Sequence, residues 1–372
     1  MKWQWKLGRF AGIDVYIHAT FLLIIAFVAW SHWALGAARV VEGILFVLAI
    51  FACVVAHEYG HALAAREFGI KTRDITLYPI GGVARLERMP DKPIQELWVA
   101  LAGPAVNVVI AAGLFGWLLL ANTLRPVGEL TVTAGPFLER LMVTNLFLVG
   151  FNLIPAFPMD GGRVLRALLA MRLEYTRATS VAAGIGQGLA LLFGLWGLFG
   201  NPMLLFIALF VWIGAGQEAS MVQMKSALAG IPVNRAMLTD FKTLAPTDPL
   251  SRAVELVLQG SQEDFPVLAN GAVAGILTRA DLLKALTQQP PSTPVSAVMQ
   301  REFLSVEAGE MLETLFARLQ EYQCHTVPVT RSGALVGLVT SENIGEFLMI
   351  QAALNQEKFR SDPNGQRSEE NE

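Results

Sequence analysis

The chain has 372 residues, of which 53% are hydrophobic and only 16% are charged, and its mean hydropathy is +0.47. Typical soluble proteins carry roughly 25% charged residues, so this composition indicates a membrane protein, and the length allows two or three domains. The net charge of −3 argues against a nucleic-acid partner. The two cysteines, Cys53 and Cys324, lie in an apolar and a polar region, which argues against a disulfide framework or a cysteine-rich metal site.

Six segments are apolar enough to be predicted as transmembrane helices, because roughly 20 helical residues cross a hydrocarbon core. They are residues 16–36, 40–65, 97–121, 138–157, 178–199 and 202–222. The first is too long for the core of a cleaved signal peptide, so we expect it to be retained. Basic residues gather before the first span, between the second and third, and between the fourth and fifth, where Arg166 is one of four. We therefore predict a multi-pass protein of the cell (inner) membrane with both termini in the cytosol.

Residues 72–88, between the second and third spans, alternate partly between apolar and polar side chains and contain Gly81-Gly82. This pattern favours a small β-hairpin at the membrane surface. An irregular basic loop is the alternative interpretation. If the hairpin forms, its edge could pair with an extended substrate segment by strand addition.

The most informative motif is His57-Glu-Tyr-Gly-His61, which closes the apolar run of residues 40–56. Histidines four residues apart lie on one helix face, so both imidazoles can reach one metal ion. Glu58 between them can act as a general base toward water. An ionisable group at mid-membrane costs about 2.5–3.5 kcal/mol on insertion scales, so three of them within five residues point to a function. The alternative is that these polar residues only end the span at the interface.

A catalytic zinc site needs a third protein ligand and keeps one position open. The other histidines lie toward the ends of the first span or in the polar region, and they are poor candidates. The better candidate is Asp160, in a segment where Pro155 and Pro158 interrupt the fourth span. Broken backbone at membrane depth is tolerated where it is buried in protein or lines a cavity. We expect Asp160 to lie level with His61, whereas a plain loop leaving the membrane is the alternative.

These two motifs together resemble those of the site-2 protease family of intramembrane zinc metalloproteases. In this chain they read His57-Glu58-x-x-His61 and Asn152-x-x-Pro155-x-x-Pro158-x-Asp160-Gly161. The resemblance covers about residues 1–222. It implies one Zn²⁺ held by His57, His61 and Asp160, with Glu58 as the catalytic base. It also implies an endopeptidase that cuts membrane-spanning protein substrates in or near their transmembrane segments, within the lipid bilayer.

Two asparagines, Asn152 and Asn107, are candidates for binding the developing oxyanion or positioning the substrate. A buried amide near a membrane site is costly unless it has a partner. Helix–helix hydrogen bonding is the alternative role for each of them.

The residues after Met224 have the composition of a soluble protein and contain an internal repeat. The sequence at Pro266 recurs at Pro328, an offset of 328 − 266 = 62 residues. Two copies suggest a pseudo-twofold pair rather than a solenoid. The repeat resembles a tandem cystathionine-β-synthase (CBS) domain pair, with domains predicted at residues 231–290 and 293–352. The cytosolic pair would regulate access to the zinc site, and its alternative role is only to form a homodimer through the CBS domains.

CBS domains often bind adenosine nucleotides through Thr-x-x-Asp at the second helix, and Thr278 and Asp281 match that motif. In the second copy Thr340 matches, but Asn343 replaces the aspartate. Asp281 as a helix cap is the alternative interpretation. The polar residues 355–372 are predicted to form a disordered tail.

The sequence therefore predicts a polytopic α-helical membrane domain over residues 1–224, with about six transmembrane helices and a small membrane-surface β-hairpin. A soluble α+β tandem CBS pair follows. The leading functional hypothesis is a CBS-regulated intramembrane zinc metalloendopeptidase. The rival is a CBS-regulated transporter or channel that uses the same polar residues as an ion path. A zinc-binding sensor without catalysis is a third hypothesis, and the intact Glu58 argues against it.

Overall fold

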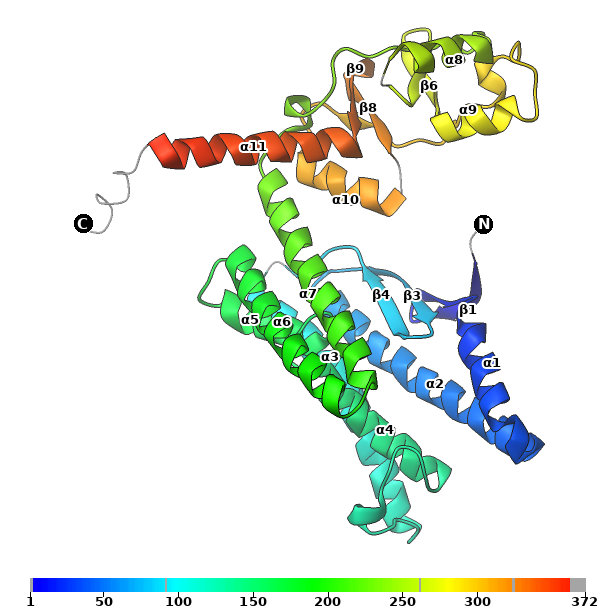
Figure 1. The fold of residues 1–372 in the computed structure, drawn as a ribbon, viewed down its shortest axis with the longest axis vertical. Helices are drawn as coiled ribbons and strands as arrows, with labels where there is room; N and C mark the ends of the chain where they lie inside the picture. The colour runs from blue at the N-terminus through cyan, green and yellow to red at the C-terminus, as the bar shows by residue number, and fades with distance from the viewer. Residues whose placement is uncertain (1–2, 91, 261, 323–324, 362–372) are drawn as a thin grey trace. The chain divides into compact units, whose positions relative to one another are not determined.

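The computed structural model describes residues 3–90, 92–260, 262–322 and 325–361 (Figure 1). The chain divides into two compact units, Met1–Val222 and Gln223–Glu372. A mixed sheet and most of the helices belong to the first unit, and the second unit consists of a repeated α/β motif.

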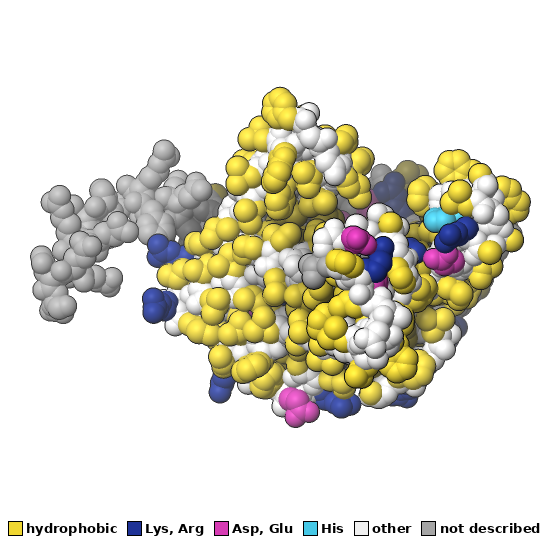
Figure 2. Space-filling model, turned by 90° about the horizontal axis from the view of Figure 1, so that it is seen from below, with side chains coloured by type: hydrophobic (Ala, Val, Ile, Leu, Met, Phe, Trp, Pro, Cys, Tyr) yellow, Lys and Arg dark blue, Asp and Glu magenta, His cyan; other side chains and the backbone are white. Residues whose placement is uncertain are grey.

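Helices make up most of the first unit. In chain order they are α1 Phe21–His32, η1 Trp33–Leu35, α2 Ala37–Glu67, α3 Pro93–Leu120, η2 Val127–Glu129, α4 Phe137–Asn152, α5 Asp160–Ala170, α6 Tyr175–Phe199 and α7 Met203–Leu228. Among the described residues, α2, α3, α6 and α7 are long and apolar enough to cross a membrane. Many large apolar side chains on these helices are exposed, as lipid-facing residues would be, and Figure 2 shows a face where hydrophobic side chains predominate.

Two of the six segments predicted as transmembrane helices do not form long helices over their predicted ranges. The span expected at 16–36 begins inside strand β2 (Ile13–His18), and the helix that follows it is short. The span expected at 138–157 is helical only as far as Asn152, because the prolines that follow cannot continue a helix. Four candidate spans are therefore present in the described residues, and the expected number of about six stays a prediction.

The sheet of the first unit has the strand order β1-β2-β3-β4, with β1 Gln4–Phe10, β3 Thr72–Tyr78 and β4 Gly81–Leu86. Strands β1 and β2 are antiparallel, as are β3 and β4, whereas β2 and β3 run parallel with α1 and α2 between them in the chain. Residues 72–88 thus contain a strand pair that is part of a larger sheet, and its location at a membrane surface stays a prediction. The sequence analysis missed β1 and β2.

One face of this sheet packs along α2 (Figure 1). Ile13 and Ile75 form a buried cluster with Ala62, and Leu77 forms another with Phe51. Positions 51 and 62 are separated by about 16 Å of helix at 1.5 Å per residue. The sheet therefore covers the stretch of α2 that carries the histidine pair.

The second unit is built from two copies of one motif. Its elements are η3 Val233–Arg235, α8 Leu250–Gln259, β5 Phe265–Ala269, β6 Ala272–Leu277, α9 Arg279–Leu286, η4 Val295–Ala297, β7 Val306–Glu307, α10 Leu312–Tyr322, β8 Thr326–Arg331, β9 Ala334–Thr340 and α11 Ser341–Ser361. Helices α8 and α10 begin 312 − 250 = 62 residues apart, and strands β6 and β9 begin 334 − 272 = 62 residues apart. The repeat offset predicted from the sequence is confirmed.

The two copies exchange their leading segments. Leu228 and Val233 precede the first copy but are buried in the core of the second copy. Val295 precedes the second copy but is buried in the core of the first. Each core is thus completed by a segment that adjoins the other copy in sequence. Helix α11 continues through residues 355–361, where the disordered tail was expected to begin, and the rest of that tail, like Cys324, lies outside the described residues.

Candidate metal centre

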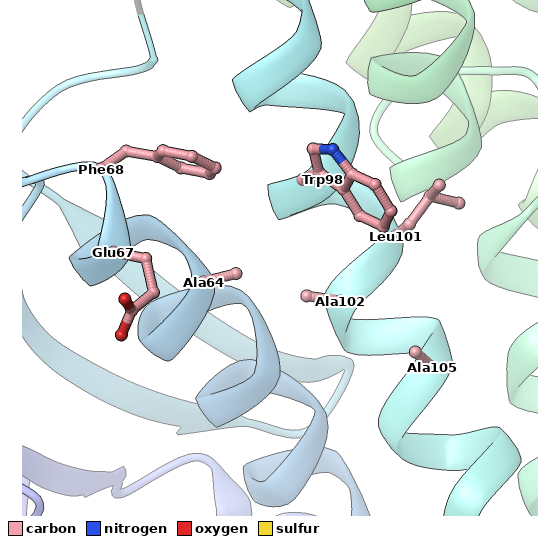
Figure 3. A pocket seen from close by; sticks show the side chains of 7 residues that line it. All are labelled: Ala64, Glu67, Phe68, Trp98, Leu101, Ala102 and Ala105. Carbon is pink, nitrogen blue, oxygen red and sulfur yellow. The ribbon is translucent and has the colours of Figure 1, made fainter.

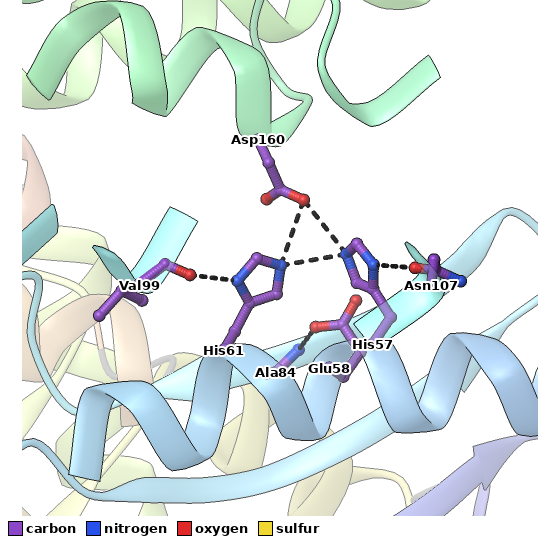
Figure 4. Close-up of polar contacts among 7 residues, drawn as sticks. All are labelled: His57, Glu58, His61, Ala84, Val99, Asn107 and Asp160. Atoms are coloured by element: carbon purple, nitrogen blue, oxygen red, sulfur yellow. Dashed lines mark hydrogen bonds and ion pairs between the residues drawn. The ribbon is translucent and has the colours of Figure 1, made fainter. Parts of the chain in front are cut away.

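Three side chains from two helices converge on one point (Figure 4). Helix α2 carries His57 and His61 one turn apart, and Asp160 is the first residue of α5. The Nε2 atoms of His57 and His61 lie 3.1 and 3.2 Å from Asp160 Oδ2, and 3.0 Å from each other. All three residues are buried, with exposed fractions of 6%, 5% and 7%. The convergence expected from the sequence is therefore present in the structure.

The outer nitrogen of each histidine has a hydrogen-bond acceptor. His61 Nδ1 lies 2.7 Å from the carbonyl oxygen of Val99 on α3, and a carbonyl oxygen can only accept. His61 therefore carries its proton on Nδ1. His57 Nδ1 lies 2.5 Å from Asn107 Oδ1, also on α3.

The orientation of the Asn107 amide follows from a chain of hydrogen bonds. Asn145 of α4 donates through Nδ2 to the carbonyl oxygen of Leu141 at 2.8 Å. Its Oδ1 then accepts from Asn107 Nδ2, also at 2.8 Å. Asn107 Oδ1 is left to accept from His57, which places the His57 proton on Nδ1.

This donor set fits a metal ion. When both rings are neutral and carry their proton on Nδ1, the two Nε2 lone pairs and the Asp160 carboxylate oxygen face one another with no hydrogen between them, an arrangement that is repulsive without a cation. Zn–N bonds of 2.0–2.1 Å in a tetrahedral site place neighbouring ligand atoms about 3.3 Å apart, close to the spacing found here. Two neutral imidazoles and a carboxylate are ligands that zinc takes in catalytic sites.

Close backbone packing holds Asp160 in place. A Cβ on Gly161 would lie 2.2 Å from the carbonyl oxygen of Ile154, and one on Gly162 would lie 2.6 Å from the Phe157 nitrogen. The first turn of α5 therefore lies directly against the irregular segment that precedes it. Only glycine permits this approach, which explains the residue pair that follows Asp160.

Helix α3 approaches the histidines equally closely at Gly103. A Cβ there would lie 2.2 Å from His61 Nε2 and 2.6 Å from His57 Nε2. The residue is buried in α3, one turn from Asn107. This helix therefore orients both imidazoles from outside and leaves room for them at Gly103.

Glu58 lies between α2 and the sheet. Its Oε2 accepts a hydrogen bond from the backbone N–H of Ala84 in β4 at 3.2 Å (Figure 4). Strand β4 is an edge strand, so this N–H belongs to the side of the strand that has no neighbour in the sheet. A Cβ on Gly82 would lie 2.8 Å from Glu58 Cγ, so β4 passes directly over this carboxylate.

The two predicted oxyanion residues have different surroundings. The contacts of Asn107 with His57 and Asn145 are the helix–helix hydrogen bonding that was the alternative for this residue. Asn152 is the half-buried last residue of α4, and its role stays a prediction. Sequence reasoning missed Asn145, although an amide within an apolar helix is a signal for such a partner. Sequence reasoning also missed the Val99 carbonyl, because a backbone acceptor cannot be recognised from the side chain of its residue.

The predicted nucleotide-binding residues of the second unit lie at helix starts. Thr278 is the N-cap of α9: its Oγ1 accepts from the Asp281 N–H at 3.1 Å and donates to Asp281 Oδ2 at 2.6 Å. Gln300 Nε2 also donates to Asp281 Oδ2, at 2.7 Å. Thr340 and Asn343 repeat the pattern at the start of α11. Nucleotide binding by these residues stays a prediction.

A separate hollow of about 420 Å³ lies between the end of α2 and α3 (Figure 3). Its lining is almost entirely apolar and consists of Ala64, Glu67, Phe68, Trp98, Leu101, Ala102 and Ala105. None of these residues belongs to the histidine–aspartate cluster. The hollow offers no convergent polar groups for chemistry.

Comparison with known proteins identifies related sequences for both units. The family model described as Peptidase family M50 matches residues 45–195, and the CBS domain model matches residues 233–288 and 295–349. A zinc metalloprotease of Methanocaldococcus jannaschii is 34% identical over 278 residues, which are 74% of this chain and 78% of that protein.

Two further similarities cover different lengths of the chain. A Synechocystis sp. protein provisionally named a zinc metalloprotease is 28% identical over 94% of this chain and 96% of its own length. The solved structure of the site-2 protease from Methanocaldococcus jannaschii is 37% identical, covers 58% of this chain and 95% of that one, and has a TM-score of 0.44.

We predict that Gly103→Ala abolishes zinc binding, because the new methyl group would occupy the space of both Nε2 atoms. The matched control is Gly113→Ala on the same helix, where an added Cβ meets nothing within 4 Å. Zinc in the purified proteins, measured by mass spectrometry, should fall to background in the first variant and stay at the wild-type level in the second. Equal zinc contents would show that α3 does not constrain the imidazoles.

Proposed function

Because this chain belongs to peptidase family M50, the site-2 protease family, and is a zinc metalloprotease with a tandem CBS pair, we propose that it cuts other membrane proteins in or near their transmembrane segments. The main support is the buried group of His57, His61 and Asp160, two of whose members lie on a helix long enough to span a membrane. A CBS-regulated ion path would not need this complete donor set.

Each residue of the centre has a role in peptide hydrolysis. Bound by His57, His61 and Asp160, zinc would supply Lewis acidity that polarises the scissile carbonyl and activates water. Glu58 would accept the proton of the attacking water on a carboxylate oxygen and deliver it to the leaving amine. Asn107 and the Val99 carbonyl would keep both Nε2 lone pairs directed inward. We assign Asn152, at the end of α4, as a donor to the developing oxyanion.

A helical substrate must unwind before it can be cut, because its carbonyls are engaged in i to i−4 hydrogen bonds. We propose that the unwound segment adds as a strand to the free edge of β4. The Ala84 N–H lies on that edge and contacts Glu58. A substrate strand beside β4 would therefore place its carbonyl groups next to the general base.

The orientation of the protein and its regulation complete the proposal. The distribution of Lys and Arg supports cytosolic termini and a cytosolic CBS pair in a multi-pass protein of the cell membrane. We propose that the CBS pair regulates cleavage by binding an adenosine nucleotide at Thr278 and Asp281. Such regulation requires different nucleotide affinities in more and less active forms. Homodimerisation through the CBS pair stays a prediction.

We predict that Glu58→Gln lowers the cleavage rate of a single-span model substrate by a factor of about 10² to 10⁴, the usual contribution of general acid–base catalysis. Glu58 is not among the three converging ligands, so zinc content should be unchanged. The rate should be followed by gel analysis in detergent or liposomes. Cleavage by the variant at the wild-type rate would refute the assigned role and the peptidase mechanism with it.

We predict that Ala84→Pro slows cleavage of a helical substrate about two- to tenfold, because one edge donor worth about 0.5–1.5 kcal/mol is lost. Ala84→Val keeps the N–H and serves as the control. A second substrate, whose cleavage region is already unwound by glycine and proline, should depend less on pairing with the β4 edge. Ala84→Pro should therefore slow its cleavage less than it slows cleavage of the helical substrate. Equal slowing of both substrates would show that the Ala84 N–H acts through its contact with Glu58 and would contradict strand addition.

We predict that Asp281→Asn weakens adenosine-nucleotide binding, because it gives the first CBS copy the residue found at the matching position of the second. Thr278 would remain in place as the N-cap, so folding should be preserved. Calorimetric titration with ATP and AMP measures binding, and cleavage assays at the same concentrations measure regulation. If the substitution leaves the nucleotide affinity unchanged, the nucleotide binds at another site. If the wild type binds neither ATP nor AMP, the proposal that an adenosine nucleotide is the ligand is wrong.

A further inference from the structure

A fully buried arginine connects three helices of the first unit. Arg166 on α5 has an exposed fraction of 0%, and its partner Glu96 on α3 has one of 2%. Arg166 Nε donates to Glu96 Oε1 at 2.8 Å, and Nη1 donates to Glu218 on α7. The guanidinium also lies 5.0 Å from the ring centroids of Phe157 and Tyr175. α5 is thereby tied to α3 on one side and to α7 on the other.

The position of this ion group matters because α5 begins with Asp160. Arg166 follows Asp160 by six residues, about 9 Å along the same helix. A buried charge is retained only where its partners hold it closely, because an uncompensated charge is strongly destabilising. The three charges therefore allow little displacement of α5 relative to α3, which carries the groups that orient His57 and His61.

Helix α7 contacts the Asp160 segment at a second point. A Cβ on Gly214 would lie 2.6 Å from Pro158 Cδ, two residues before Asp160. Gly214 and Glu218 are four residues apart, so they lie on the same face of α7. One helix face thus supports the chain on both sides of the third ligand.

We propose that Arg166 is the positioning residue for Asp160, and that the Gly214 and Glu218 face of α7 supports it in that role. The inference rests on the proposed function for its effect on cleavage. Its effect on metal retention is independent of that function.

The first test compares two glycine substitutions on α7. Gly214→Ala should displace Pro158, whereas Gly216→Ala, whose new Cβ would meet only Gln187 Nε2 at 3.6 Å, is the matched control. We expect Gly214→Ala to release zinc to a chelator at least about tenfold faster, to change the visible spectrum of the Co²⁺-loaded protein, and to lower kcat with little change in KM. Wild-type behaviour of Gly214→Ala in zinc release and spectrum would overturn the proposal.

The second test addresses the ion group directly. Glu218→Gln removes one charge at a partly exposed side chain, and Glu174→Gln changes an exposed glutamate outside the group. Of the two glutamate variants, we expect only Glu218→Gln to release zinc faster than the wild type. We also expect the zinc-release rate of Arg166→Lys to be closer to the wild-type rate than that of Arg166→Met. A lower melting temperature with wild-type zinc release and kcat would reduce Arg166 to a purely structural role.

Failure of this inference is distinguishable from failure of the proposed function. If the wild type cuts its substrate in a Glu58-dependent manner while Glu218→Gln retains zinc normally, only the positioning role is wrong. If Glu58→Gln cuts as well as the wild type, the proposed function fails, and zinc release still decides whether Arg166 positions Asp160.

Discussion

The structure of the centre depends on two protons that point outward. His57 and His61 each donate a hydrogen bond from Nδ1, one to an asparagine on α3 and one to a backbone carbonyl of the same helix. Only in this tautomer do both Nε2 lone pairs face Asp160, which makes the site a ligand set for a cation rather than a hydrogen-bonded cluster. α3 supplies both acceptors, and its close approach at Gly103 brings them within reach. The packing of two membrane helices thereby determines the chemistry of their side chains.

The parts of the centre that were predicted from the sequence are those whose chemistry depends on side-chain type and spacing. The histidine pair needed only helical periodicity, and Asp160 stood out because prolines and glycines surround it. The Val99 acceptor escaped prediction because a backbone carbonyl looks the same at every residue. Arg166 was interpreted as one of several basic residues that set membrane orientation, yet it is fully buried in an ion group. Sequence alone does not distinguish a cytosolic arginine from one whose partners lie 70 residues before it and 52 residues after it.

The sheet shows a different limit of sequence reasoning. The strand pair within residues 72–88 contains a Gly-Gly turn signal, whereas β1 was not predicted and the end of β2, from residue 16 on, fell inside the expected first span. Tertiary packing decides between these interpretations, because Ile13 and Ile75 are buried together against Ala62. Strand β4 carries both the Ala84 N–H that contacts Glu58 and the free edge, so the proposed general base on α2 lies beside the strand that the proposed substrate segment would join.

The exchange of leading segments between the CBS copies has a consequence for biosynthesis. Leu228, at the end of α7, is enclosed by residues from the second copy that are made about 80 to 115 positions later, among them Leu312 and Ile344. A nascent chain can already contain His57, His61, Asp160 and the whole of α7 before the residues that pack around the end of that helix have been synthesised. The C-terminal end of α7 therefore reaches its final packing only after the residues of the second copy have been synthesised.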